Sequence, residues 1–289
     1  MAQRGLTAQR IHRQGRRISR LVGRSTASLR MEPDFLIVGA QRCGTTSLYK
    51  TLTQHPAVLP AGLHKGVHYF DTDYERGPAW YRSHFPTRLA AKRSERRTGS
   101  WPITGEASPY YMFHPMVSER IARDLPQARL IVLLRDPVER AYSAYTHERA
   151  RGFEALSFED ALAAEPERLA GEEDRLRADP GYVSRSHQHN AYLARGRYVE
   201  QLERLESAVG RERLCVIDSD ELFSDFTKRL PEVLEHLKLD PWLPESFEQR
   251  NARPRTKLEP EVRRRLEDYF APYDERLASW WGREPGWRT

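Results

Sequence analysis

The turn at residues 39–47 carries the clearest chemical signal in this sequence. It follows the apolar run Phe-Leu-Ile-Val and leads into Thr-Thr-Ser-Leu, so it reads as a buried strand, a glycine turn and a helix start. The first N–H groups of a helix have no partner inside the helix and point at whatever occupies the turn. Gly39 and Gly44 have Walker A spacing, but Thr45 and Thr46 stand where that loop has lysine and then serine or threonine. The nearest cation is Arg42, so we expect a phosphate-bearing donor rather than ordinary ATPase chemistry.

A second candidate anion site follows the apolar run 130–134. Arg135 comes directly after this run, and Ser143 lies about two helical turns further along the chain. Arginine binds phosphate through a planar, forked set of donors. Alternatively, Arg135 pairs on the surface with Asp136 or Glu139. Together with the first turn, Arg135 predicts a donor that carries phosphates at both ends of a nucleoside.

The two candidate anion sites can act together only if the strands that precede them end at the same edge of a sheet. Short apolar runs at 35–38, 130–134 and 214–217 are typical of strands covered on both faces. Helices are predicted between and after them, at 45–54, 115–125, 137–151, 191–209, 226–237 and 259–270. This alternation predicts an α/β fold, with a single P-loop-like domain at 32–289 and a central parallel sheet flanked by helices. Right-handed crossovers place both candidate sites at the carboxyl edge of that sheet.

The segment 152–186 differs in composition from the rest, being rich in Glu, Arg and Ala and broken by Pro166 and Pro180. We expect a helical excursion followed by a mobile polar loop that serves as a lid. His187 and His189 come next, and we interpret both as solvated.

The charge of the chain is uneven. The net charge is +6, but residues 1–31 contain eight arginines and no acid, which leaves 39 basic and 41 acidic residues elsewhere. We predict that 1–31 is a basic, flexible tail; an amphipathic helix on an anionic membrane or a nucleic acid is the alternative. No specific nucleic-acid partner is expected, and the oligomeric state is open. No apolar run reaches the length of a secretory segment or a membrane span, so we expect a cytoplasmic protein with peripheral contact at the inner membrane face.

Cysteine and histidine spacing gives no further site. Cys43 and Cys215 cannot form a disulfide framework, which fits a reducing compartment. We expect no metal, because no paired metal-ligand pattern surrounds them.

An ordered set of motifs over residues 34–250 resembles the sulfotransferases that use 3′-phosphoadenosine 5′-phosphosulfate (PAPS), specifically the heparan sulfate branch and its bacterial relatives. The motifs are Gln-Arg-Cys-Gly-Thr-Thr-Ser-Leu at 41–48, Val-His-Tyr-Phe-Asp at 67–71, Trp-Tyr at 80–81 with Phe-Pro at 85–86, Gly-Glu-Ala-Ser-Pro-Tyr-Tyr at 105–111, and the segment 135–143.

The resemblance implies donor-binding roles for specific residues. The 39–47 turn would hold the 5′-phosphosulfate, and Arg42 stands where the family usually has a lysine. Arg135 and Ser143 match ligands of the 3′-phosphate, residues 196–198 resemble a helix start that flanks the donor, and a basic loop at 253–257 would close over the adenosine. The implied donor ligands are Gln41, Arg42, Cys43, Gly44, Thr45, Thr46, Ser47, Arg135, Ser143, Tyr198, Arg255 and Lys257.

One position departs from the family pattern. In the family, the glutamate of the motif Lys-Glu-x-His-Phe-Phe acts as the general base. This chain has Gly66 at the position of that glutamate. General-base help is typically worth about 10²–10⁴-fold. We predict that His68 replaces the base and that Asp71 orients it, with Glu106 as the second candidate. A buried, hydrogen-bonded histidine of purely structural role is the alternative for His68.

The resemblance therefore predicts sulfonyl transfer from PAPS to an acceptor hydroxyl, with Arg42 also taking part in catalysis. The acceptor is expected to be a carbohydrate or glycolipid, or another small molecule. The alternatives are a PAPS- or nucleotide-binding protein with weakened catalysis and, from a different enzyme class, a P-loop nucleotide kinase. Tyr81, Tyr110 and Tyr111 are candidates to stack on sugar rings or to pack in the core, whereas Trp80 is expected to pack.

Overall fold

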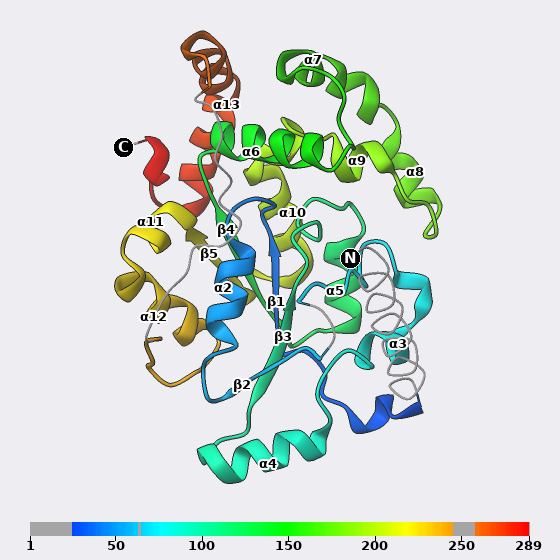
Figure 1. The fold of residues 1–289 in the computed structure, drawn as a ribbon, viewed down its shortest axis with the longest axis vertical. Coiled ribbons are helices and arrows are strands. Elements are labelled where there is room, and N and C mark those ends of the chain that lie inside the picture. Colours follow the sequence, from blue (N-terminus) through cyan, green and yellow to red (C-terminus); the bar gives the residue numbers. More distant parts are fainter. Residues whose placement is uncertain (1–24, 63–64, 245–257, 289) are drawn as a thin grey trace, which may run out of the picture.

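A five-stranded parallel sheet forms the centre of the computed structural model, which describes residues 25–62, 65–244 and 258–288 (Figure 1). The strands in the described residues run in the order β2-β3-β1-β4-β5, so β1 lies in the middle between β3 and β4. Their bounds are β1 Phe35–Gly39, β2 Val58–Pro60, β3 Ile103–Ala107, β4 Arg129–Leu134 and β5 Leu214–Asp218. The predicted α/β fold with a parallel sheet flanked by helices is confirmed.

Helices cover the sheet and extend above its carboxyl edge. Their bounds are α2 Thr45–Leu52, α3 Pro78–Arg82, α4 Arg88–Thr98, α5 Val117–Asp124, α6 Pro137–Ala150, α7 Phe158–Leu169, α8 Glu172–Ala178, α9 Arg185–His189, α10 Tyr198–Val209, α11 Ser219–Ser224, α12 Phe226–His236 and α13 Pro260–Trp281. Helix α2 packs on β1 and β3, whereas α5 packs against α10 and α10 against α13. In Figure 1, α6, α7 and α9 lie above the ends of β1 and β4, where the chain leaves the sheet toward the site.

The sheet forms from the apolar runs because its central strands are covered on both faces. Every residue of β1 is buried, and in β4 only the first residue is not fully buried. Strands β2 and β3 were not predicted. The first has only three residues, and the second includes Gly105 and Glu106, which break the apolar pattern.

Two helices differ from prediction for local reasons. Helix α10 begins at Tyr198 rather than at 191, because the Glu165 carboxylate accepts hydrogen bonds from three successive amides, those of residues 192–194, at 2.7 Å each. These bonds hold the backbone outside a helix. Helix α13 continues to Trp281, well past the predicted end, and carries Pro272 inside it; Asp274 and Leu277 on this extension are buried.

The segment 152–186 has the predicted helical excursion, followed by a non-helical stretch at residues 179–184. It contains α7 and α8, and α9 follows with His187 buried inside. The prediction that His187 is solvated is therefore wrong: its ring stacks on Phe113 with centroids 4.2 Å apart, and its Nδ1 lies 2.8 Å from the Tyr110 hydroxyl.

The described residues 25–31, at the end of the basic segment, pack against the domain. The Met31 amide donates to the Pro86 carbonyl at 2.9 Å, and the Arg30 guanidinium donates to the Phe85 carbonyl at 2.7 Å. Residues 1–24 lie outside the described residues, and so does the tail's predicted membrane contact.

Candidate active site

The two predicted anion sites meet at the carboxyl edge of the sheet. Strand β1 pairs in parallel with β4, so the loops that follow the two strands are neighbours. Arg42 Nε, in the first loop, donates a hydrogen bond to Ser143 Oγ on α6 at 3.1 Å, across 101 positions of sequence. The predicted juxtaposition of the turn with Ser143 is therefore present in the fold.

The turn itself has the backbone of an anion cradle. Gly44 has φ +85°, and a Cβ there would stand 2.2 Å from Phe223 Cζ, so both conformation and space require glycine. Gly44 is the N-cap of α2, and within the described part of the chain no side chain caps that end. The first N–H groups of α2 therefore face the turn, which suits a phosphate or sulfonate. Thr45 and Ser47 are buried beside it, and Thr46 is half-buried.

Cys43 and Tyr198 connect the turn at residues 39–47 to the loop after β4. The Cys43 thiol is buried, and burial raises the pKa of that thiol to about 11. Its sulfur lies 3.8 Å from the Tyr198 hydroxyl, which donates to the Arg135 carbonyl at 2.9 Å. Both side chains thus join the turn to the β4–α6 loop, and neither lines the cavity of this site in the described residues.

Arg135 lies at the end of β4 with part of its guanidinium buried. Its Nε is 3.5 Å from Asp220 Oδ1, and within the described residues it is buried without a hydrogen-bond partner. Of the alternative partners, Asp136 and Glu139 both pair with Arg263, and in the described residues the carboxylate beside Arg135 is that of Asp220. A buried N–H that lacks an acceptor fits the predicted role toward an anion.

A cavity of about 390 Å³ opens beside the turn. Basic and polar side chains from distant parts of the sequence line it, including Gln41, Lys65, His68, Tyr110, Arg151 and Arg195. Gln41 Oε1 accepts a hydrogen bond at 2.7 Å from the buried Arg195 guanidinium, which lies over the Tyr110 ring at 4.8 Å. The cavity thus extends from the glycine turn to α9 and to the short helical turn at residues 194–196 that precedes α10.

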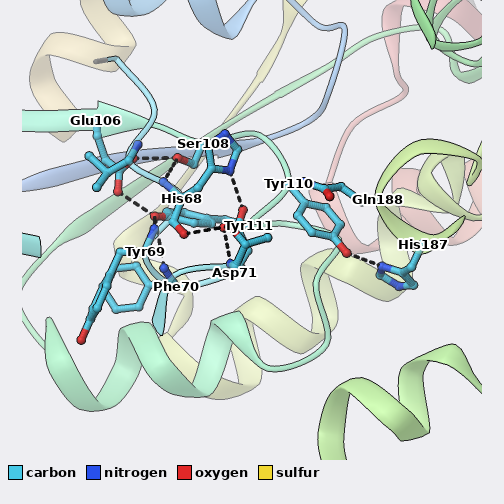
Figure 2. A network of polar contacts seen from close by, with 12 residues as sticks. His68, Tyr69, Phe70, Asp71, Glu106, Ser108, Tyr110, Tyr111, His187 and Gln188 are labelled. Carbon is cyan, nitrogen blue, oxygen red and sulfur yellow. Dashed lines mark hydrogen bonds and ion pairs between the residues drawn. The ribbon is translucent and has the colours of Figure 1, made fainter. Parts of the chain in front are cut away.

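His68, which lines the cavity, forms a pair with the buried Asp71 (Figure 2). His68 Nδ1 lies 2.8 Å from Asp71 Oδ2, and the His68 side chain is 42% exposed whereas that of Asp71 is fully buried. Burial acts to lower the pKa of His68, but the Asp71 carboxylate outweighs it, and the pKa is raised overall. Since Nδ1 faces Asp71, Nε2 is the nitrogen left to act on a substrate.

Glu106 holds the loop that carries His68 and is not among the described residues that line the cavity. Its carboxylate is completely buried and accepts four hydrogen bonds, from the Val67 amide and the hydroxyls of Ser108, Tyr81 and Tyr111, at 2.7–2.9 Å. Burial raises the pKa of this carboxyl group. Because all four donors belong to the protein, Glu106 is placed to fix the loop rather than to take a substrate proton.

The same network holds the loop in an unusual shape. The Tyr111 hydroxyl accepts from the Tyr69 amide at 2.8 Å, and Ser108 Oγ accepts from the His68 amide at 3.1 Å. His68 itself has φ +58°, a left-handed conformation that is uncommon for a residue with a side chain. Trp80 is buried as predicted; of the three candidate tyrosines, Tyr81 and Tyr111 are buried in this network and Tyr110 lines the cavity.

Gly66 has no room for the family's glutamate. A Cβ at this position would lie 2.8 Å from the Ala107 carbonyl oxygen and 3.3 Å from Ser108 Oγ. It would also lie 3.6 Å from His68 Nε2. The free nitrogen of His68 therefore lies beside the position from which a glutamate side chain would start.

Several cavity residues were not predicted from the sequence. No role was predicted for Lys65 or Arg195, which both line the cavity. His189 was predicted to be solvated, but it lines the cavity and its Nδ1 lies 3.1 Å from Glu148 Oε2. The predicted donor ligands Arg255 and Lys257 lie outside the described residues.

Neither a metal-binding cluster nor a membrane-spanning helix is found in the described residues. Across residues 25–62, 65–244 and 258–288, no cluster of three or more His, Cys, Asp or Glu side chains is arranged to hold a metal ion. No helix in those ranges has both the length and the apolar character needed to cross a membrane.

Comparisons with known proteins agree on one family. The sulfotransferase domain model matches residues 32–252. Human heparan sulfate glucosamine 3-O-sulfotransferase 6 is 29% identical over 88% of this chain and 73% of its own length. Membrane-associated sulfotransferase kil1 of Dictyostelium discoideum is 35% identical over 39% of this chain, which spans only 22% of that protein.

The fold comparison gives the same result. The crystal structure of a sulfotransferase from Alicyclobacillus acidocaldarius superposes with a TM-score of 0.64 at 29% identity, covering 90% of this chain and all of the other. Since the family model also spans most of the sequence, the chain belongs to the sulfotransferase family.

Proposed function

We propose that this sulfotransferase moves a sulfonyl group from PAPS to a hydroxyl group of a carbohydrate or glycolipid. One observation carries the proposal. The glycine cradle, the Arg135–Ser143 region and the His68–Asp71 pair converge at one edge of the sheet. That set supplies two anion sites and one proton acceptor, which are the groups that transfer between a nucleotide donor and an alcohol requires.

The donor is assigned by the fit of charges to the cradle. The N-terminus of α2, with Gln41, Thr45, Thr46 and Ser47, would hold the 5′ end of PAPS. Arg135 and Ser143 would hold the 3′-phosphate, and the Arg135 Nε that lacks a hydrogen-bond partner in the described residues supports this assignment. When bound, PAPS supplies a sulfonyl group activated by attachment to phosphate.

His68 would accept the proton of the attacking hydroxyl at Nε2. Asp71, bonded to Nδ1, fixes the ring and stabilises its protonated form. Glu106 acts as a positioning residue, because it holds the Val67 amide and, through Tyr111, the amide that follows His68. Its predicted role as second candidate base has no support in this geometry.

The acceptor class rests on relatives and on the cavity. Several relatives are named for heparan sulfate. A cavity of about 390 Å³ has room for a sugar unit, and Tyr110 offers an aromatic wall. Peripheral contact of the Arg-rich tail, predicted at residues 1–31, with an anionic membrane surface would suit a lipid-borne acceptor.

The test is transfer by the purified chain. It is incubated with PAPS and a panel of heparan-type oligosaccharides, glycolipids and simple alcohols, with chelator present, and products are read by mass spectrometry. We expect a product heavier by one sulfonate, made by the wild type and strongly reduced in His68→Ala. Absence of transfer to every acceptor, together with absence of PAPS binding, would refute the proposal.

Gly66 favours a second candidate, a PAPS-binding protein with weakened catalysis. The glutamate that the family usually has is missing, and a side chain there would meet the Ala107 carbonyl. This candidate predicts tight binding of the product 3′-phosphoadenosine 5′-phosphate without transfer to any acceptor. A titration with ATP and Mg²⁺ tests the kinase alternative in the same experiment, because a kinase would prefer that ligand.

A further inference from the structure

Arg42, the cation expected near the 5′-phosphosulfate of the donor, points instead toward the region assigned to the 3′-phosphate. Arg42 occupies the position of the family's lysine in the turn, but its Nε donates to Ser143 Oγ, on the side assigned above to the 3′-phosphate. Among the described residues that line the cavity, Arg42 is absent. A sulfonyl group bound where the turn at residues 39–47 meets the cavity would therefore need a cation other than Arg42.

Lys65 supplies one. Its Nζ donates to Thr46 Oγ1 in the first turn of α2 at 2.6 Å, and the residue lines the same cavity as His68. Its backbone is held independently, because the Lys65 carbonyl accepts a hydrogen bond at 2.7 Å from the amide of Ala107, the last residue of β3. The ammonium group thus contacts the first turn of α2 and lines the same cavity as the proposed base, on a chain segment anchored to the sheet.

We propose that Lys65, rather than Arg42, contacts the sulfonyl group that is transferred. This inference rests on the function proposed above. In the transfer, the bond between sulfur and the donor's phosphate oxygen breaks, a bond from sulfur to the acceptor oxygen forms, and the acceptor proton passes to His68. The bisphosphate leaves with the bonding electrons. Lys65 stabilises the negative charge on the sulfonyl oxygens as they pass from phosphate to acceptor.

The charge of Lys65 should depend on pH in the neutral to mildly alkaline range. Burial, with Lys50 nearby, lowers the pKa of Lys65 to about 8, while Glu106 acts in the opposite direction. The other basic groups facing the cavity are His68, His189, Arg151 and Arg195. Loss of the Lys65 proton above that pH would remove the charge, whereas an arginine at the same position would keep it.

Equilibrium binding without acceptor tests the contact directly. PAPS carries the sulfonate and 3′-phosphoadenosine 5′-phosphate lacks it, so Lys65→Ala should weaken binding of PAPS by about 10–100-fold and leave binding of the bisphosphate nearly unchanged. Arg135→Ala should weaken both ligands alike. Lys92→Ala, an exposed lysine on α4, is the matched control and should change neither. Calorimetry measures all eight affinities of the wild type and the three variants.

A pH series separates charge from structure. PAPS affinity of the wild type should fall as pH rises through about 8, and Lys65→Arg should hold its affinity over the same range. An equal loss for both ligands in Lys65→Ala, or no loss, would overturn the role of Lys65 while leaving the proposed function standing. If the wild type binds neither ligand, both proposals fall together.

Discussion

Replacing Gly66 by glutamate restores the family's residue, and we predict that it will not restore the family's catalysis. The Cβ would begin 2.8 Å from the Ala107 carbonyl oxygen, whereas ordinary contact begins at 3.4 Å. The backbone must therefore move by about 0.6 Å next to a sheet-anchored segment. The hydrogen bonds on either side, from the Ala107 amide to the Lys65 carbonyl and from the Val67 amide to Glu106, are each 2.7 Å long and would both be strained.

The expected cost follows from these contacts. Overpacking of this kind costs roughly 1–3 kcal/mol. For a chain of this size, each kcal/mol lowers the melting temperature by about 2–4 °C, so Gly66→Glu should melt roughly 2–12 °C below the wild type. The turnover number should fall as well, because the shift displaces His68 from its partner. Thermal unfolding followed by circular dichroism, with and without bisphosphate, measures the first effect, and transfer kinetics measure the second.

Two alanine variants make the test specific. Gly66→Ala introduces the Cβ without the carboxylate and should lose comparable stability. Gly62→Ala is the matched control from the same region, because its Cβ would stand at an ordinary 3.7 Å from the His84 carbonyl oxygen, and it should lose little. A Gly66→Glu protein that turns over faster than wild type and melts at the same temperature would refute the steric argument.

Three further predictions concern the base, its support and the donor. His68→Ala should lower kcat by about 10²–10⁴-fold without changing the Kd of the bisphosphate. The wild-type rate should rise with pH through the raised pKa of His68, because only the neutral ring accepts a proton; Asp71→Asn should move that rise to lower pH in a pH–rate profile. Glu106→Gln should lower the melting temperature, since an amide cannot accept from all four donors, at a cost of about 1–3 kcal/mol. Arg135→Ala should weaken the bisphosphate by about 10–100-fold but leave adenosine 5′-phosphosulfate, which has no 3′-phosphate, unchanged by calorimetry.

The sequence predicts the sheet wherever burial leaves a continuous apolar run. Strands β1, β4 and β5 carry such runs, and their order along the chain puts both anion loops on one edge. Strand β3 escaped prediction because Glu106 is buried within it, and a buried carboxylate is recognisable only once its four donors are known. Those donors come from positions 67, 81, 108 and 111.

Side-chain direction is what the sequence leaves open at the site. The motif places Arg42 in the turn but does not say that its Nε is bound to Ser143. Lys65 reaches Thr46 only because its carbonyl pairs with an amide 42 positions away. His187 and His189 look polar in sequence, but their rings stack on aromatic neighbours, Phe113 beside the buried His187 and Phe153 beside the half-buried His189.

The central place of β1 has a consequence for how the protein is made. Both of its neighbours, β3 and β4, are synthesised after it, so a nascent chain carries β1 with two unpaired edges until residues 103–134 have emerged. The turn at residues 39–47 is completed later still, because Gln41 is hydrogen-bonded to Arg195, which is synthesised 154 positions after it. At about 5–20 residues per second, that interval is roughly 8–30 s. Truncated chains that end before α10 should therefore expose an apolar strand and need chaperone protection during synthesis.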